Sequence, residues 1–232
     1  MAIYITGDTH GDFDRIQEFC DYTGTTQSDD IMIVLGDAGI NYFLDRADFS
    51  LKEELLEHQI TYFCIHGNHE ERPDMIDSYE EVEWHGGIVY MEEDYPNLVF
   101  AKDGEIYDFD GKKSIVIGGA YSIDKMSRIS SGAPWFETEQ PDEGIMDYVE
   151  SQLDKVGWKI DFVLSHTAPL KYEPVEEFIP NYNQAYIDKS TEKWLDTIEK
   201  HLKYERWFLG HYHCDKRSGR ITIMFEEIEE LF

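Results

Sequence analysis

The sequence predicts an α/β fold in which two mixed β-sheets are flanked by helices. In the first 65 residues, continuous apolar runs of strand length alternate with amphipathic stretches, as expected for parallel strands that are buried on both faces and covered by helices. From residue 98 onward, a second series of strands and helices follows. We therefore expect a two-sheet sandwich with helices on its outer faces.

Strands and helices alternate in the first part of the chain. Strands are predicted at residues 2–6, 31–35 and 61–65, and helices at 13–22 and 46–58. In the first helix Asp14 precedes Gln17 by three residues, which is the spacing of a capping box. The second helix is expected to have an apolar side made of Phe49, Leu51, Leu55 and Leu56.

The second part of the chain begins with a pattern typical of hairpins. The pairs Asp103-Gly104 and Asp110-Gly111 separate three short apolar runs, and both pairs are strong turn signals. A helix is expected from Pro141, which suits the first helical position, to just before Gly157. The full set for this part is strands at 98–100, 105–109, 113–117, 161–164, 207–209 and 220–225, and helices at 141–156 and 191–202.

Composition limits the class of protein. A chain of 232 residues with 41% hydrophobic residues fits one α/β domain spanning residues 1–232. It contains no apolar run of membrane-spanning length and no basic leader, and its three cysteines are scattered, so a cytoplasmic location is expected. The formal net charge of −29 disfavours stable binding to nucleic acid or to an anionic membrane. The oligomeric state is left open.

Metal-binding side chains follow the predicted strands. Carboxylate, amide and imidazole groups that meet at the carboxyl ends of strands can hold two divalent cations. Asp37 follows an apolar strand and suits the task of bridging two ions, since each carboxylate oxygen can serve one of them. The candidate ligands, in chain order, are Asp8, His10, Asp37, Asn68, His166, His211 and His213.

The ordered set of motifs resembles the calcineurin-like metallophosphoesterase family. The motifs are Gly-Asp-x-His, Gly-Asp, Gly-Asn-His-Glu, a lone strand-end His and Gly-His-x-His, between Asp8 and His213. The resemblance implies a four-layer αββα sandwich. It also implies one metal held by Asp8, His10, Asp37 and His213, and another held by Asp37, Asn68, His166 and His211. His69 would act beside the substrate as general acid or transition-state stabiliser.

The activity that this resemblance implies is hydrolysis of a small phosphomonoester or phosphodiester by a hydroxide that bridges the two metals. Mn²⁺ is our first choice of metal. Fe, Zn, Co or Ni are alternatives, because mixed oxygen and imidazole ligands do not fix the ion. Ile40 and Asn41 stand where protein phosphatases of this kind have an acid and an arginine. These departures weaken the protein-phosphatase interpretation and leave the partner of His69 unidentified. The remaining candidate functions are a nuclease of the same superfamily and a metal-binding, non-catalytic scaffold.

Residues that contact the substrate are harder to predict. Tyr121 follows a predicted strand, Arg128 lies in a segment (122–140) expected to form a substrate-specificity loop, and Arg72 follows the third motif as a candidate phosphate clamp. The stretch 181–184 is a further candidate for the lining of the cleft. Among the other histidines, His66 is expected to point away from the site and His85 to lie in a loop.

Overall fold

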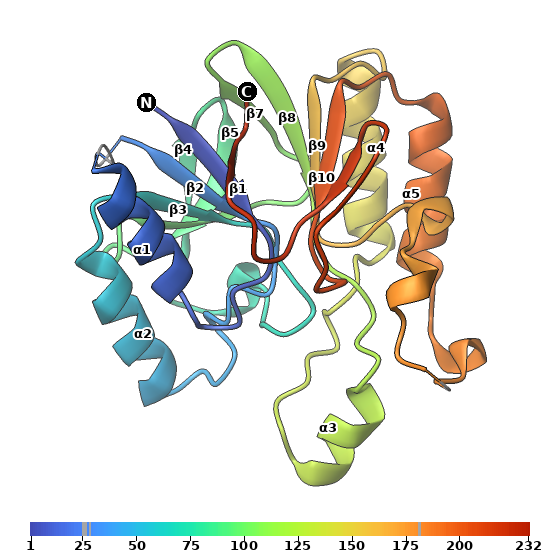
Figure 1. Ribbon diagram of the computed structural model, residues 1–232, viewed down its shortest axis with the longest axis horizontal. Helices are drawn as coiled ribbons and strands as arrows, with labels where there is room; N and C mark the ends of the chain where they lie inside the picture. The colour runs from blue at the N-terminus through green and yellow to red at the C-terminus, as the bar shows by residue number, and fades with distance from the viewer. Residues whose placement is uncertain (25–26, 28, 181) are drawn as a thin grey trace.

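Two mixed β-sheets are stacked between two layers of helices in the computed structural model, which describes residues 1–24, 27, 29–180 and 182–232 (Figure 1). The first sheet has the strand order β13-β1-β2-β3-β6-β5-β4, and the second has the order β11-β12-β10-β9-β8-β7. The helices α1 (Asp14–Thr23) and α2 (Arg46–Leu56) cover the outer face of the first sheet, and α4 (Glu143–Lys155) and α5 (Ser190–His201) cover that of the second. The predicted four-layer αββα sandwich is confirmed.

The central strands of both sheets run parallel. In the first sheet these are β1 (Ile3–Thr6), β2 (Ile31–Val34), β3 (Thr61–Cys64) and β6 (Leu98–Ala101). In the second they are β8 (Lys112–Ile117), β9 (Phe162–Ser165), β10 (Arg206–Leu209) and β12 (Ile221–Ile223). The antiparallel edge strands are β4 (Glu80–Trp84), β5 (Gly87–Met91), β7 (Ile106–Phe109), β11 (Lys216–Ser218) and β13 (Glu229–Glu230).

The core has three parts, as the layers require. Ile33 and Phe63 of the first sheet pack against Val116 and Phe208 of the second, and all four side chains are buried. One further cluster lies between the first sheet and its helices, and another lies between the second sheet and its helices. Burying one such side chain contributes about 1.5–3 kcal/mol. Strands buried on both faces explain why the sequence shows continuous apolar runs there rather than alternation.

The remaining helices are short and lie outside these layers. Helix α3 (Lys125–Ser131) projects from the lower side of the molecule in Figure 1, within the segment expected to be a loop. The 3₁₀ helices are η1 (Pro73–Met75), η2 (Leu170–Tyr172), η3 (Val175–Glu177) and η4 (Gln184–Tyr186). Among the described residues, no helix combines the length and the apolar character that crossing a bilayer requires.

Three local predictions about the helices were wrong. Helix α1 begins at Asp14 without a capping box, because the carboxylate of Asp12 accepts the N–H of Asp14 instead (3.1 Å). In α2, Phe49 is 54% exposed and Leu56 is 42% exposed, so the expected apolar side is only partly buried. Helix α4 begins after Pro141 and is capped by the side chain of Asp142, which accepts the N–H of Ile145 (2.8 Å).

The predicted succession of hairpins was also partly wrong. The turn at Asp110-Gly111 joins β7 to β8 as expected. Asp103-Gly104, however, lies where the chain passes from β6 in the first sheet to β7 in the second, so it joins no hairpin. A hairpin that we did not predict from the sequence joins β4 to β5, with the turn at His85 (φ 47°) and Gly86 (φ 83°).

Candidate metal centre

The loops that follow β1, β2, β3, β9 and β10 meet at one end of the sandwich and bring the predicted ligands together. Among the described residues, three groups of possible ligand atoms occur, and the atoms within each group lie within 4.8 Å of one another. These groups are Asp8, His10 and His213; His10, Asp37 and His69; and Asp8, Asp37 and His166. Parallel strands of one sheet have their carboxyl ends at the same edge. Because the two sheets are stacked with these edges at the same end, residues from both halves of the chain converge.

Asp37 occupies the middle of this cluster. Its side chain is 2% exposed, and Oδ1 accepts the backbone N–H groups of Asn68 (2.7 Å) and His69 (2.8 Å). Burial alone would raise the pKa of Asp37, but His166, together with His69 and His10, holds the pKa well below its usual range. Asp37 therefore stays ionised, as a ligand for a cation must.

Asp8 belongs to the first motif and contacts the last motif at the other side of the cluster. Its Oδ1 accepts the N–H of His211 (2.9 Å), while its buried Oδ2 lies 3.3 Å from Nε2 of His213. The Nε2 atoms of His10 and His213 are only 2.8 Å apart. One carboxylate oxygen and two imidazole nitrogens thus face the same point, which is the donor set that a divalent transition-metal ion takes. Hydrogen bonding to Asp8 raises the pKa of His213.

His166 and Asn68 give an independent test of whether a cation fits. Nδ1 of His166 lies 2.8 Å from the carbonyl oxygen of Leu35, so Nδ1 carries a proton and Nε2 is the nitrogen that can bind a metal. The amide of Asn68 donates through Nδ2 to Ser122 (2.9 Å), and its Oδ1 lies 2.8 Å from Nε2 of His166. These two atoms are therefore close enough to bind the same cation.

His211 completes the predicted ligand set. Its ring centroid lies 5.0 Å from that of His166, and the side chain lines the cavity beside the cluster. Desolvation lowers the pKa of His211 to about 3, so the ring is neutral at physiological pH and its lone pair is available to a metal.

The backbone around the ligands is strained in a way that the sequence only partly signals. Asp37 (φ 46°), His10 (φ 48°), His211 (φ 68°) and His213 (φ 48°) all lie in the left-handed region, which few non-glycine residues adopt and in which Asp and His are enriched. Gly36 has φ 96°, and a Cβ there would lie 2.1 Å from Nδ1 of His166. Glycine at this position is thus required for the ligand to approach.

Helix α3 supplies the partners of His69 that the sequence did not identify. The guanidinium of Arg128 contacts the His69 ring, and its Nε donates to Asp124 (2.8 Å). Asp124 also lies 3.9 Å from Nε2 of His69. Burial lowers the pKa of His69, although Asp37 opposes the shift. A carboxylate from a distant part of the chain therefore lies near His69, which the second motif alone did not predict.

The other predicted substrate contacts fall in different places. Tyr121 lines the cavity beside the metal-ligand cluster. Arg72 does not; its guanidinium donates to Asp103 (2.6 Å) and to the carbonyl of Thr138 (2.9 Å), and it lines a second cavity together with His66. These contacts engage Arg72 away from the cluster. Of the stretch 181–184, Tyr182 and Gln184 line the first cavity, and residue 181 lies outside the described residues.

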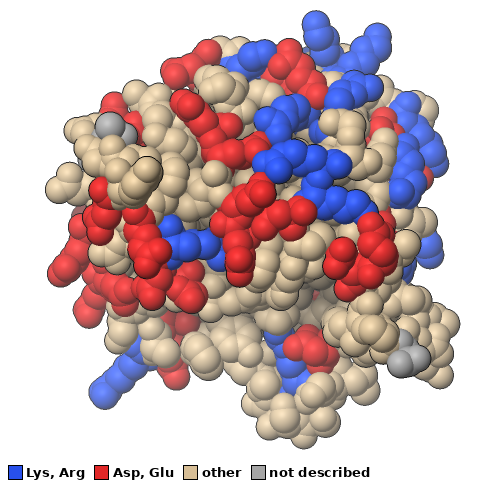
Figure 2. Space-filling view, in the orientation of Figure 1, with Lys and Arg blue, Asp and Glu red and all other residues tan. Residues whose placement is uncertain are grey.

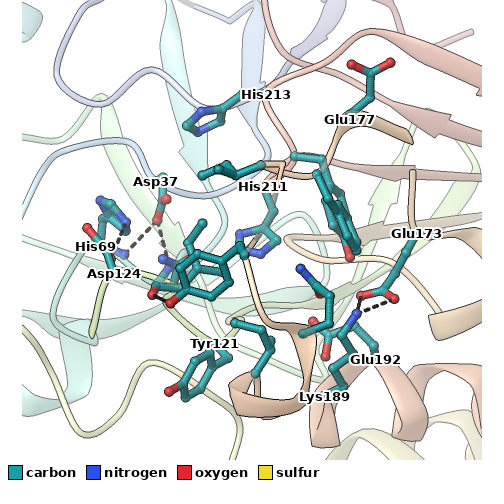
Figure 3. A pocket seen from close by; sticks show the side chains of 18 residues that line it. Asp37, His69, Tyr121, Asp124, Glu173, Glu177, Lys189, Glu192, His211 and His213 are labelled. Carbon is teal, nitrogen blue, oxygen red and sulfur yellow. Dashed lines mark hydrogen bonds and ion pairs between the residues drawn. The ribbon is translucent and has the colours of Figure 1, made fainter. Parts of the chain in front are cut away.

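The cavity beside the ligands has a volume of about 460 Å³ (Figure 3). One end of the cavity is lined by Asp37, His69, His211 and His213, and the other end is lined by Glu173, Lys189 and Glu192. We did not predict these last three from the sequence, nor Phe178 and Tyr212 on the wall. Acids and lysines on a predicted helix or loop resemble ordinary surface residues, so no sequence signal distinguishes them.

The fold and the cluster of candidate metal ligands at the ends of the parallel strands point to a metal-dependent hydrolase. The sequence matches the calcineurin-like phosphoesterase family over residues 1–215, and the chain belongs to that family. It is accordingly a metal-dependent enzyme acting on phosphoric esters. No curated protein matches the sequence.

Similar solved structures have low sequence identity to this chain. The phosphopantetheinyl hydrolase from Mycobacterium tuberculosis is similar over 97% of this chain and 88% of its own, with a TM-score of 0.51 and 11% identity. An archaeal phosphodiesterase has a TM-score of 0.31 and 10% identity, over 97% and 82% of the two chains. A protein serine/threonine phosphatase from Saccharomyces cerevisiae has a TM-score of 0.36 and 16% identity, over 97% and 67%.

Proposed function

We propose that this protein is a dinuclear metallophosphoesterase that hydrolyses a small phosphomonoester or phosphodiester. The observation that carries the proposal is the pair of close contacts between candidate ligand atoms, His10 with His213 and His166 with Asn68, on either side of the ionised Asp37. Each contact brings two candidate ligand atoms close enough to bind one cation. Two positions flanking one carboxylate match the arrangement that two-metal hydrolases use.

The residues divide into two groups of ligands around Asp37. We assign Asp8, His10 and His213 to one ion, and Asn68, His166 and His211 to the other, with Asp37 shared. Bound divalent cations supply Lewis acidity toward the phosphoryl oxygens and lower the pKa of a water molecule. The family membership supports the assignment, and one candidate ligand group, Asp8 with His10 and His213, coincides with the first set.

His69 and Arg128 are proposed to act on the phosphoryl group and its leaving oxygen. His69 lies at the cavity end that holds Asp37, and the buried guanidinium of Arg128 contacts its ring. A guanidinium there offers donors to phosphoryl oxygens. His69 is placed to donate a proton to the leaving oxygen or to hydrogen-bond with it. The segment 122–140 is thus proposed as the specificity element, within a single unit spanning residues 1–232.

Mn²⁺ remains our first choice of metal, with Fe, Zn, Co and Ni as alternatives, since a ligand set that mixes oxygen and imidazole nitrogen does not fix the ion. A cytoplasmic location, a small phosphorylated substrate and the lack of stable nucleic-acid binding belong to the same proposal. The charge supports the last point: acidic side chains dominate the left of the face shown in Figure 2, and the whole chain carries −29. Long polyanions are repelled by such a surface.

The test is hydrolysis by metal-stripped protein resupplied with Mn²⁺. We expect turnover of p-nitrophenyl phosphate or bis-p-nitrophenyl phosphate that depends on metal, and the preferred ester identifies a monoesterase or a diesterase. Asp37→Asn should lose metal content and turnover together, whereas Asp110→Asn, in a distant hairpin turn with φ 51°, is the matched control. His69→Asn should lower turnover but keep the metal. Two bound metals without turnover of either ester would favour a non-catalytic scaffold.

A further inference from the structure

The cavity extends well beyond the metal-ligand cluster, and this outer part has apolar walls. It lies between the segment that precedes α3 and the segment 173–192 that leads into α5. Five aromatic or aliphatic side chains form much of the wall: Tyr121, Ile123, Phe178, Tyr182 and Tyr212. A volume of about 460 Å³ is in the range of pockets that enclose small organic molecules.

The charges that line the same part are almost all negative. Its carboxylates are Glu173, Glu177 and Glu192; Asp124 also lines the cavity, but it lies beside His69 and pairs with Arg128. The one Lys or Arg among the described lining residues is Lys189, and its Nζ is bound to both oxygens of Glu173 (2.9 and 2.8 Å; Figure 3). Among these described lining residues, no cation is therefore left to receive a second phosphate of a substrate, and the remaining carboxylates would repel one.

Glu192 differs from the other acids because it is buried and only half satisfied. It is 4% exposed, and Oε1 accepts the hydroxyl of Thr167 (2.9 Å). Within the described part of the chain, Oε2 is buried without any hydrogen-bond partner. Such an atom is costly to leave unpaired, since it has lost water and gained nothing in return. Glu192 lines the cavity, so its side chain borders the space that a bound molecule would occupy.

Glu192 is also joined to the loops that carry the metal ligands. Thr167, its partner, directly follows His166, and the Thr167 hydroxyl lies 3.0 Å from the hydroxyl of Tyr212. Tyr212 stands between His211 and His213 in the sequence. Glu192 is thus linked by hydrogen bonds to residues adjacent in sequence to the candidate ligands His166, His211 and His213, and it lines the same cavity as His211 and His213.

We infer that this outer cavity binds the leaving group of the substrate, an alcohol with an aromatic or apolar body that ends in an N–H donor, best a primary amine, directed at Glu192. The inference rests on the proposed phosphoesterase function and specifies its substrate class. The apolar walls take the body, Oε2 of Glu192 takes the donor, and the acidic rim excludes polyphosphates and polynucleotides. A charge-assisted hydrogen bond of this kind contributes roughly tenfold or more in affinity.

The test compares three aryl phosphates of similar leaving-group reactivity in the Mn²⁺-loaded protein. Their para substituents are 2-aminoethyl, propyl and 2-carboxyethyl, so they differ mainly in the charge and donor at the far end. We expect kcat/KM for the amine to exceed that for the propyl ester by roughly tenfold or more, and the carboxylate to be the poorest substrate. Equal values for the amine and the propyl ester would overturn the inference.

Two variants locate the effect. Glu192→Gln should remove most of the preference for the amine over the propyl ester. Asp196→Asn removes one carboxylate from the same helix, where it pairs with Lys200 (3.2 Å) outside the cavity, and should keep the preference. An amine preference that survives Glu192→Gln would assign it to another group and refute the role of Glu192.

The inference and the proposed function can fail separately. If none of the three esters is hydrolysed, the phosphoesterase proposal fails and the inference fails with it. If all three are hydrolysed at similar rates, only the inference fails. Should Glu192→Gln not fold, inhibition of p-nitrophenyl phosphate hydrolysis by tyramine, compared with 4-propylphenol, tests the same contrast in the unaltered protein. Tyramine should inhibit roughly tenfold more strongly, and equal inhibition would refute the inference.

Discussion

Replacing Glu192 by glutamine should stabilise the protein, and by more as the pH rises. Burial raises the pKa of Glu192 to about 7 from an ordinary value of 4.5. The folded state therefore favours the protonated, neutral side chain. The contribution of the neutral side chain to the free energy of unfolding is complete below the pKa of the unfolded state. It is lost as the pH rises from about 4.5 through about 7. Glutamine resembles the neutral form at every pH, so the Glu192→Gln variant does not lose this stability as the pH rises.

The size of the effect follows from the same two values. The interval between 4.5 and about 7, at about 1.4 kcal/mol per pH unit, corresponds to about 3 kcal/mol over the whole titration. Measurements should begin near pH 5.5, above the isoelectric point of about 4.4, where the protein is more soluble. From there to pH 8.5 we expect the advantage of the variant to grow by about 2 kcal/mol, or about 5 °C in Tm.

The assay is thermal unfolding of both proteins in matched buffers with a chelator, so that metal occupancy does not change with pH. The difference between the two Tm values is the informative quantity, because groups common to both proteins cancel. A difference that stays constant with pH would show that Glu192 is not held neutral by burial. A difference that shrinks as the pH rises would reverse the sign of the reasoning.

Two further substitutions test the packing around the site and the first sheet. Gly36→Ala adds a Cβ 2.1 Å from Nδ1 of His166 at φ 96°, so it should cost about 2–4 kcal/mol and displace the ligand. Gly86→Ala, at φ 83° with no atom within 4 Å, should show only the backbone cost, and equal losses in urea unfolding would disprove the clash with His166. Lys52→Met leaves the buried Glu92 without its partner at 2.5 Å and should cost about 3 kcal/mol. Lys52→Met with Glu92→Gln should recover part of the loss, and a double variant less stable than the single one would argue against an ion-pair origin.

The sequence by itself determined the layers of the fold and the residues that meet at the strand ends. Both depend on local patterns: an apolar run of strand length predicts a buried strand, and the turn that follows it holds the ligands. Asp8, Asp37 and His166 could be placed at one edge because parallel strands end on the same side. Their roles as metal ligands remain proposals, which measurement of the bound metal will test.

Tertiary structure decided which partners surround these residues. The chain leaves one sheet for the other at Asp103-Gly104, although that pair has the composition of a hairpin turn. Arg128 reaches His69 from 59 residues away, and Glu192 is buried on a helix where its neighbours in sequence look like surface residues. Contacts between distant segments depend on the packing of whole layers, so no periodicity or motif in the local sequence encodes them.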